Sequence, residues 1–513
     1  MNCDFTENSA ASSGGGIYTE TRDGSIIDNC FFGLNIAEDD LWTGGGGGLF
    51  IQSSPTTVTN CTFSRNSTTM RRGAGIFVRE SDATINGCIF EDNSEAASTA
   101  AGIQIFSDST EVTVTISDSE FSGGLANWGP GITVYGDVVT ADIINCDINN
   151  NMALLSGGGV YIGFGSSTNI IGTEINNNIA ENGGALGTQN DLSTVTVVDS
   201  DLSFNEAIRG GAVNMNTFDD PFVGNPSLEI ARSTFNFNDC TEQGGVLNLS
   251  NSDLSIASSL FTNNLNASAA GAGGAMSLNT VGPKENVYRL TNNTFFANEG
   301  ALGADIGNWT DSTGVSTLIL QNNIFSGSFN DSYAIEDGFP VIVSTGGNLS
   351  DDASLMPFAN AMNDTHNEFP SFSAPGFGEF NLRDDSPAID SGINDGAPEL
   401  DILGNSRVGD VDKGAYEFGV MTAVEDLTTS LAQLSIYPVP ADELVQYNLD
   451  NDWNGTVQLI VRNVLGQVIH QEKINKAESV LQGTVQISHL EKGSYLLNLR
   501  NETHSVTRTF IKQ

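Results

Sequence analysis

The chain has 513 residues, of which 57 are Gly and 16% are charged, a composition typical of a turn-rich folded protein and not of a disordered one. Its 63 acidic residues far outnumber the 19 basic ones, and the formal net charge is −44. This charge argues against nucleic acid and anionic membrane surfaces as partners, and leaves cations or a basic partner open. No segment is long and apolar enough to predict a transmembrane helix.

A short pattern repeats through residues 1–325: an apolar anchor, usually an Asn three residues later, a Gly-rich turn and a second apolar residue. The anchors lie 26 to 34 residues apart, which is the signature of a solenoid. The Asn suits a sharp turn because it tolerates positive φ, and Asn residues of successive coils can also pair amide to amide. The anchors are Phe5, Phe32, Phe63, Phe90, Phe121, Ile148, Ile175, Leu202, Phe235, Phe261, Phe295 and Phe325.

A coil this short cannot bury its own apolar residues, so it must stack on its neighbours at a spacing of about 4.8 Å. We therefore expect an all-β fold, a right-handed parallel β-helix of about twelve coils over residues 1–325. Phe261 and Asn264, followed by Gly273 to Met276, resemble the polymorphic outer-membrane-protein repeat of surface adhesins. Because Met1 lies inside a coil, without a signal peptide or a cap, we expect N-terminal coils to be missing.

Most of the cysteines occupy one position of the coil, two residues before the anchor. Strand alternation points this position inward, as it does the anchor. Neighbouring Cβ atoms at the strand spacing of about 4.8 Å are farther apart than the roughly 3.8 Å that a disulfide prefers. We therefore expect buried free thiols at Cys3, Cys30, Cys61, Cys88 and Cys146, and an unpaired Cys240 outside this row.

The residue just before the anchor points outward and is acidic in four successive coils, at Glu120, Asp147, Glu174 and Asp201. Carboxylates stacked at about 4.8 Å repel each other by about 1 kcal/mol per pair even in water. The row is tolerated if it is solvated, and it is favoured if a hard cation lies between the oxygens. A solvated acidic stripe is thus one interpretation; a Ca²⁺ site and an active-site row are the alternatives.

A second outward row follows the Gly-rich turn, with Tyr18, Phe50 and Phe77 in consecutive coils and Tyr161 farther along. Stacked rings on a solenoid face could form a platform for sugar rings. They could equally pack beneath a loop or a missing cap, which is the commoner situation for aromatic residues.

An enzyme is the main rival to a binding protein, because many β-helices cut acidic polysaccharides with paired carboxylates or with Ca²⁺ and an Arg or Lys base. The coils contain few residues that suit such chemistry. All four His residues lie outside the coils, and Lys284 is the single Lys within them. The carboxylate pairs Asp39-Asp40 and Asp219-Asp220 fall in loops, where a solvated role is usual.

Residues 322–418 carry three motifs in order: Ser386 to Gly392, Asp401 to Arg407 and Asp412 to Glu417. These resemble the choice-of-anchor Q domain, which follows β-helices in bacterial surface proteins. We expect the segment to cap the last coil, with a buried Arg407 pairing with Asp390, Asp401 and Asp412. A metal site made by the same Asp residues is the alternative.

Residues 419–432 have the composition of a linker, and residues 433–513 contain short alternating runs separated by Gly or Asn turns. This pattern predicts a small immunoglobulin-like β-sandwich. Its motifs resemble the type A sorting domain of type IX secretion, although Val439 stands where that family usually has Asn. The resemblance implies export by the type IX secretion machinery, removal of the domain, and attachment or release of the cargo. The residues that carry it are Tyr437, Pro438, Pro440, Gly466, Gly493, Tyr495 and Lys512.

These features together indicate an exported protein, extracellular or on the outer cell surface. The leading hypothesis is a noncatalytic scaffold for adhesion, or for binding a glycan or another surface protein. The alternative is a polysaccharide lyase or glycoside hydrolase acting in a groove of the β-helix. Carboxylates converging with Arg or Lys in a groove would favour the enzyme, whereas scattered acids on flat faces would favour the scaffold.

Overall fold

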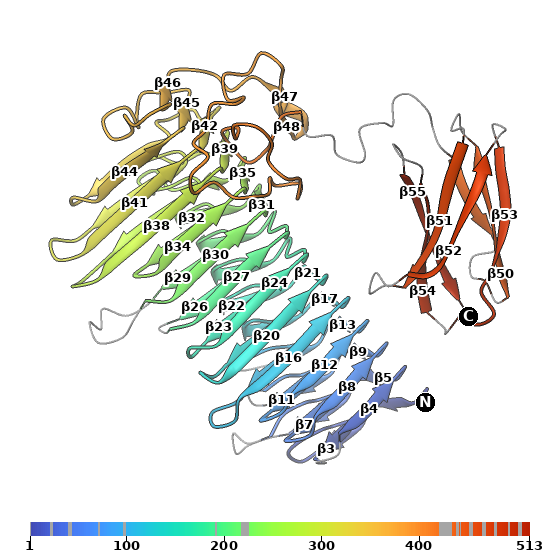
Figure 1. The fold of residues 1–513 in the computed structure, drawn as a ribbon. Coiled ribbons are helices and arrows are strands. Elements are labelled where there is room, and N and C mark those ends of the chain that lie inside the picture. Colours follow the sequence, from blue (N-terminus) through green and yellow to red (C-terminus); the bar gives the residue numbers. More distant parts are fainter. Residues whose placement is uncertain are drawn as a thin grey trace. The chain divides into compact units, whose positions relative to one another are not determined.

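The computed structural model forms two compact units, Met1–Phe418 and Gly419–Gln513 (Figure 1). It describes residues 2–20, 24–38, 44–69, 72–95, 99–189, 192–216 and 225–418 of the first unit. In the second unit it describes residues 419, 433–437, 441, 443–450, 455–463, 468–476, 480–490, 493–500 and 505–512.

The first unit is the predicted right-handed parallel β-helix, and one coil shows its plan (Figure 1). β20 (Val139–Ile144), β21 (Asp147–Asn149), β22 (Met152–Ser156) and β23 (Val160–Gly163) follow one another around the axis. Each pairs in parallel with its equivalent in a neighbouring coil, so the strands form stacked sheets. We name the sheets the long face (β20), the anchor face (β21), the short face (β22) and the groove face (β23).

Over the described residues, the long face has twelve strands, from β4 (Ser25–Asp28) to β44 (Val341–Gly346). The anchor face consists of two ladders, β1 (Asp4–Thr6) to β21 and β31 (Thr234–Asn236) to β46 (Thr365–His366). The ladders thus continue past Phe325, where the sequence pattern fades. The groove face runs through β3 (Ile17–Thr19), β7 (Leu49–Gln52), β11 (Ile76–Arg79), β15 (Ile103–Phe106), β19 (Ile132–Tyr135), β23, β26 (Leu186–Gln189), β29 (Val213–Asn216), β33 (Leu247–Ser250), β37 (Met276–Thr280), β40 (Ile306–Thr310) and β43 (Tyr333–Asp337).

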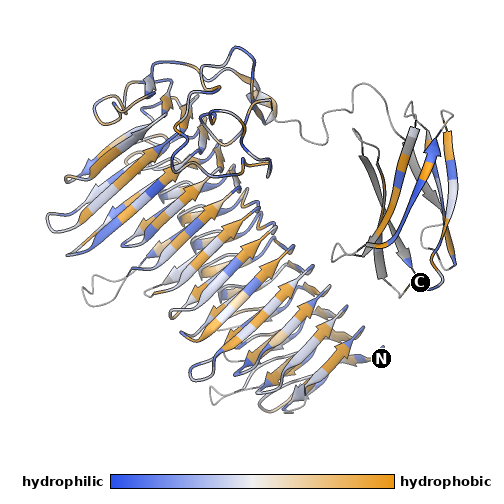
Figure 2. Ribbon diagram, viewed as in Figure 1, coloured by the Kyte–Doolittle hydropathy of each residue, from blue (hydrophilic) through white to orange (hydrophobic). Residues whose placement is uncertain are grey.

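Stacked anchors fill the core of the β-helix, and apolar and polar residues alternate along its strands (Figure 2). Phe32 and Phe63 stack with ring centroids 4.6 Å apart and planes 3° apart. A second column begins at Phe235 and Phe261, with centroids 4.8 Å apart. Between the columns Ile148, Ile175 and Leu202 occupy the same position, and all three are fully buried. The apolar anchors therefore form one continuous core along the axis.

Buried Asn residues form a second ladder inside the turn that follows the anchor. Asn178 donates from Nδ2 to the carbonyl of Ile148 at 2.8 Å and to Oδ1 of Asn205 at 3.2 Å. Its own Oδ1 accepts from the backbone N–H of Asn151 at 3.0 Å. The predicted amide pairing is confirmed. The expected positive φ lies one residue earlier, at Asn177 (φ 57°), because the ladder Asn must point inward to reach its neighbours.

All six cysteines are free, as predicted. In the inward row, the backbone N–H of Cys146 donates to Oγ1 of Thr173 at 3.2 Å, so the small side chains of the row also link neighbouring coils. Burial raises the pKa of Cys146 to about 11 and that of Cys240 to about 12, which keeps both thiols protonated at neutral pH.

The segment after the coils covers both an end and a side of the β-helix. Leu355 and Ala359 complete the core at the C-terminal end, and the ring of Phe358 meets Tyr333 edge to face. Farther along, Phe372 and Phe380 pack against Phe296 on the outer side of the anchor face, with centroids 5.9 and 5.2 Å away. The predicted cap is therefore also a lateral cover.

Arg407 is buried in this cover, as predicted, but its ion pair is with Glu417, and Asp401 and Asp412 act on it only through their charges. Its Nη1 lies 2.9 Å from Oε2 of Glu417, and both side chains are almost completely buried. Asp412 instead accepts from the backbone N–H of Asp390 at 2.7 Å, and Asp401 accepts from that of Asn405 at 2.8 Å. A short Asp side chain satisfies nearby backbone donors more readily than a distant guanidinium, which explains the difference.

The second unit contains two antiparallel sheets, in line with the predicted β-sandwich. The buried side chains of Val445, Leu459 and Leu497 lie in its core. The described strands are β49 (Gln433–Tyr437), β50 (Leu444–Asp450) and β53 (Val480–Gln486) in one sheet, and β52 (Val468–Lys476), β51 (Gly455–Asn463), β54 (Gly493–Arg500) and β55 (Ser505–Lys512) in the other.

The Asn ladder yields a stability prediction. Asn178→Ala removes the bonds of this amide to Ile148, Asn151 and Asn205, and the buried backbone N–H of Asn151 loses the oxygen to which it donates. We expect the free energy of unfolding to fall by about 2–4 kcal/mol, measured by urea denaturation of the full chain. The matched control is Asn177→Gly, because Asn177 is exposed and already has a positive φ. Equal losses from the two substitutions would contradict a ladder role.

Asp305 supplies a pH-dependent prediction, because it ends the Asn ladder in a fully buried position. Its Oδ1 accepts from Nδ2 of Asn298 at 2.9 Å. Burial, followed by the charges of Asp352 and Asp351, raises its pKa from 3.8 to about 7. The folded state thus binds a proton more tightly than the unfolded chain, and this contribution to stability is lost as pH rises through 7.

Asp305→Asn should remove this loss while keeping the bond from Asn298. We expect the variant to be more stable than the unaltered chain at pH 8, by up to about 4 kcal/mol, and similar to it at pH 4. Urea unfolding at the two pH values measures the difference. Parallel pH profiles for the two proteins would show that Asp305 does not titrate as described.

Candidate functional site

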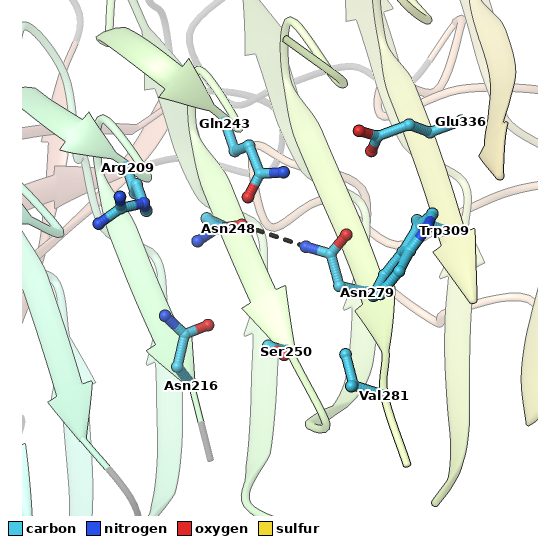
Figure 3. Close-up of a pocket in the computed structure, with 9 residues that line it drawn as sticks. All are labelled: Arg209, Asn216, Gln243, Asn248, Ser250, Asn279, Val281, Trp309 and Glu336. Atoms are coloured by element: carbon cyan, nitrogen blue, oxygen red, sulfur yellow. Dashed lines mark hydrogen bonds between the residues drawn. The ribbon is translucent and has the colours of Figure 1, made fainter. Parts of the chain in front are cut away.

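A groove of about 620 Å³ opens on the outer side of the groove face (Figure 3). Its size falls within the range of small-molecule sites in proteins. Amide side chains dominate its wall, together with one indole ring and one guanidinium. The described residues that line it are Arg209, Asn216, Gln243, Asn248, Ser250, Asn279, Val281, Trp309 and Glu336.

Strand alternation explains why polar groups gather here. The backbone register pairs Ser250 with Asn279, and Asn279 with Trp309, so these positions form one row along the axis. The preceding residues in β33 and β37, Leu249 and Leu278, point the other way and are fully buried in the core. The same stacking that builds the core therefore places a polar row outside it.

Hydrogen bonds hold the amides of the groove in fixed orientations. Asn279 donates from Nδ2 to Oδ1 of Asn248 at 3.3 Å, which Figure 3 shows as a dashed line. Asn248 and Asn216 both donate to Oδ1 of Asn214, at 2.8 and 3.1 Å. Within the described part of the chain, Oδ1 of Asn216 accepts no hydrogen bond although the atom is buried. The wall thus contains an amide network with an unused acceptor.

The groove has little net charge. Nη2 of Arg209 lies 2.6 Å from Oε2 of Glu242, so the guanidinium is already paired. Glu336 is the single carboxylate among the nine described lining residues, and its pKa is raised by burial and by the charge of Asp337. Trp309 presents its ring beside these groups (Figure 3). The site therefore suits an uncharged ligand with both hydroxyl groups and an apolar face.

None of the groove residues was selected from the sequence. A signal was present in the strands β29, β33 and β37, where polar residues flank one apolar residue: Asn214 and Asn216, Asn248 and Ser250, and Ser277 and Asn279. These residues form two adjacent outward rows, and the first continues the row of Tyr18 and Tyr161 toward the C-terminus, so following that row farther along the chain would have found them.

The predicted acidic row lies elsewhere, on the anchor face, and its register is confirmed. Glu120 pairs with Asp147 across β17 (Glu120–Ser122) and β21, and isolated bridges join Asp147 to Glu174 and Glu174 to Asp201. Burial, and then the charges of Asp147 and Asp201, raise the pKa of Glu174. Burial also raises the pKa of Asp201. The row therefore carries a repulsion that a cation could relieve; a Ca²⁺ site here stays a prediction.

Three of the four residues predicted to form an aromatic platform are buried and cannot offer a ring face to a sugar. Tyr18 is 46% exposed, whereas Phe50, Phe77 and Tyr161 are at most 5% exposed. Their side chains do point outward from the groove face, but other residues cover them. The guanidinium of Arg72 lies 5.5 Å from the ring centroid of Phe77, and the ring of Trp128 lies 6.5 Å from that of Tyr161. Such rings support the surface without presenting a face to solvent.

The sorting-domain residues are only partly described. Tyr437 lies in β49, and Gly493 of β54 pairs with Lys512 of β55. Tyr495 is buried in the sandwich core. Pro438, Pro440 and Gly466 lie outside the described residues, as do the loop carboxylates Asp39, Asp40, Asp219 and Asp220.

The acidic row yields a prediction about repulsion. Glu174→Gln weakens the repulsion from Asp147 and Asp201, so we expect the thermal unfolding midpoint at pH 7 to rise by about 1 °C. The control is Glu91→Gln, an exposed carboxylate outside the row. If the row binds Ca²⁺, millimolar Ca²⁺ will raise the midpoint of the unaltered chain and this rise will disappear in Glu174→Gln. A lower midpoint for the variant without added Ca²⁺ would contradict the repulsion.

Two segments match known protein families. Residues 1–137 match the family described as right-handed beta helix region, and residues 435–513 match the family described as secretion system C-terminal sorting domain. No curated protein matches the chain. In the described part of the chain we find no helix with the length and apolar character that a membrane span requires.

The two matches agree with the fold of each unit. The first covers the early coils of a solenoid that the structure extends well beyond residue 137, and the second covers the sandwich. A sorting domain of this type is handled by the type IX secretion machinery. The chain is therefore a secreted or cell-surface protein, built from a right-handed parallel β-helix and a C-terminal type IX sorting domain.

Proposed function

We propose that the β-helix is a noncatalytic binding scaffold outside the cell, and that its groove takes a neutral saccharide. The observation that carries this proposal is the pair of hydrogen-bonded outward amides, Asn248 and Asn279, beside the indole ring of Trp309 in a groove of about 620 Å³.

A saccharide matches the chemistry of these side chains. Sugar hydroxyls both donate and accept hydrogen bonds, and an amide offers a donor and an acceptor at one position. The bonds among Asn214, Asn248 and Asn279 orient the amides before a ligand arrives, which reduces the entropy lost on binding. The C–H face of a sugar ring can pack on Trp309, as apolar groups do on aromatic rings.

The charges favour a neutral saccharide over an acidic one. Arg209 is engaged with Glu242, and Glu336 adds negative character to the wall. The net charge of −44 gives the whole protein a field that repels polyanions. Uronic acid polymers, the substrates of many β-helix enzymes, are therefore poor candidates.

The groove also favours binding over catalysis. Glycoside hydrolysis generally uses two carboxyl groups on opposite sides of the bond that breaks, and Glu336 is the single carboxylate among the described lining residues. Elimination requires a free basic side chain, whereas Arg209 is held in an ion pair. The lyase or hydrolase alternative would need a second reactive group at this site.

The test is a polysaccharide panel with the purified full chain. We will compare neutral polymers (a β-glucan, a mannan and a xylan) with acidic ones (pectate and alginate), measuring both affinity and new reducing or unsaturated ends. We expect binding to at least one neutral polymer without products. Trp309→Ala should lower this affinity by about tenfold or more.

The matched control is Phe237→Ala, which removes a half-exposed stacked ring at the turn between the anchor and short faces. Its affinity should equal that of the unaltered chain. New chain ends would establish the enzyme alternative, and binding restricted to the acidic polymers would overturn the proposed ligand class.

A further inference from the structure

The row of side chains that forms the groove wall does not end at the groove. Its positions continue in backbone register from coil to coil, one residue per coil along the groove face. From the groove toward the N-terminus, the paired positions are Trp309, Asn279, Ser250, Asn216, Gln189, Gly163, Tyr135 and Phe106.

The far end of this row is aromatic. The ring centroids of Phe106 and Tyr135 are 5.9 Å apart, and those of Tyr135 and Phe164 are 4.3 Å apart. The guanidinium of Arg72 lies 4.7 Å from the ring centroid of Phe106 and so supports it from one side. Phe164 is 57% exposed, so its ring is accessible from solvent beside Tyr135. We name Phe106, Tyr135 and Phe164 the aromatic row.

Gly163 follows Tyr135 in the row of paired positions, and it leaves room there for the neighbouring aromatic rings. A Cβ atom at Gly163 would lie 3.0 Å from the ring of Tyr161 and 3.4 Å from that of Tyr135. The absence of a side chain there lets these rings approach, and Phe164, the next residue, supplies the exposed ring. Tyr161, one of the four residues of the predicted platform, is therefore a buried support beneath the aromatic row.

We propose that the ligand is a polymeric neutral glycan whose chain lies parallel to the solenoid axis and contacts both the groove and the aromatic row. This inference rests on the proposed function and adds a second subsite to it. Phe106 and Trp309 are seven coil steps apart, which corresponds to about 34 Å at the strand spacing. A monosaccharide or disaccharide cannot reach both subsites, whereas a chain of many sugars can.

Two linked contacts predict a specific dependence on ligand length. Once a chain reaches the second subsite, its binding there becomes intramolecular, so affinity rises without any change in the groove. A short oligosaccharide occupies the groove alone. The effect of removing an exposed ring from the aromatic row should therefore depend on chain length, whereas the effect of removing Trp309 should not.

The experiment is calorimetric titration of the full chain with oligosaccharides of two to ten units and with the parent polymer, prepared from whichever neutral glycan binds in the panel. The variants are Phe164→Ala, Trp309→Ala and the control Phe237→Ala. We expect affinity to keep rising with length beyond three or four units. Phe164→Ala should lower affinity for the longest chains at least fivefold and leave the shortest unchanged, while Trp309→Ala weakens binding at every length.

Two results would overturn the second subsite: affinity that stops rising once the groove is filled, or Phe164→Ala without effect at any length. Either result with Trp309→Ala still weakening binding would leave the groove proposal standing. Failure of every neutral glycan to bind the unaltered chain would overturn both proposals together.

Discussion

In-register parallel stacking is the constraint on which this structure depends. A coil cannot bury its anchor alone, and within each column the Phe rings of successive coils stack on one another at centroid distances of 4.6 to 5.0 Å. The Asn ladder adds specificity, because each buried amide is satisfied only when its neighbours stand at the same coil position, as at Asn178 and Asn205. A slip of one residue would bury polar groups without partners and expose the anchors.

The backbone register that aligns the core residues of successive coils also aligns their outward-facing residues. Any residue type that recurs at one coil position becomes a row on the surface. The consequence depends on the chemistry of the row: Asp147 and Glu174 repel each other, whereas Asn279 and Trp309 form the wall of the groove for which we propose a ligand. Function can therefore be placed on this scaffold through outward positions alone, without any change in the core, and the sorting domain delivers the result to the outside of the cell.

The sequence was most informative where the structure depends on the period of the coil. Anchor spacing predicted the β-helix, and counting from the anchor predicted the free thiols and the register of Asp147 with Glu174. It was least informative where irregular connections decide the outcome. Arg72 of the preceding connection packs against the ring of Phe77, and Arg407 pairs with Glu417 where a nonrepetitive segment folds onto the anchor face. Trp309 was missed because its neighbours across coils are chemically different, so only the register reveals the row.

The most direct measurement of the central claim is hydroxyl-radical footprinting of the full chain with and without the neutral polysaccharide that binds it. The method reports the solvent access of individual side chains. The account predicts slower oxidation of Trp309 in the complex, and an unchanged rate at Phe237, which lies away from the groove face. Protection at Phe237, or an unchanged rate at Trp309 under saturating polysaccharide, would contradict the claim that the groove face binds the glycan.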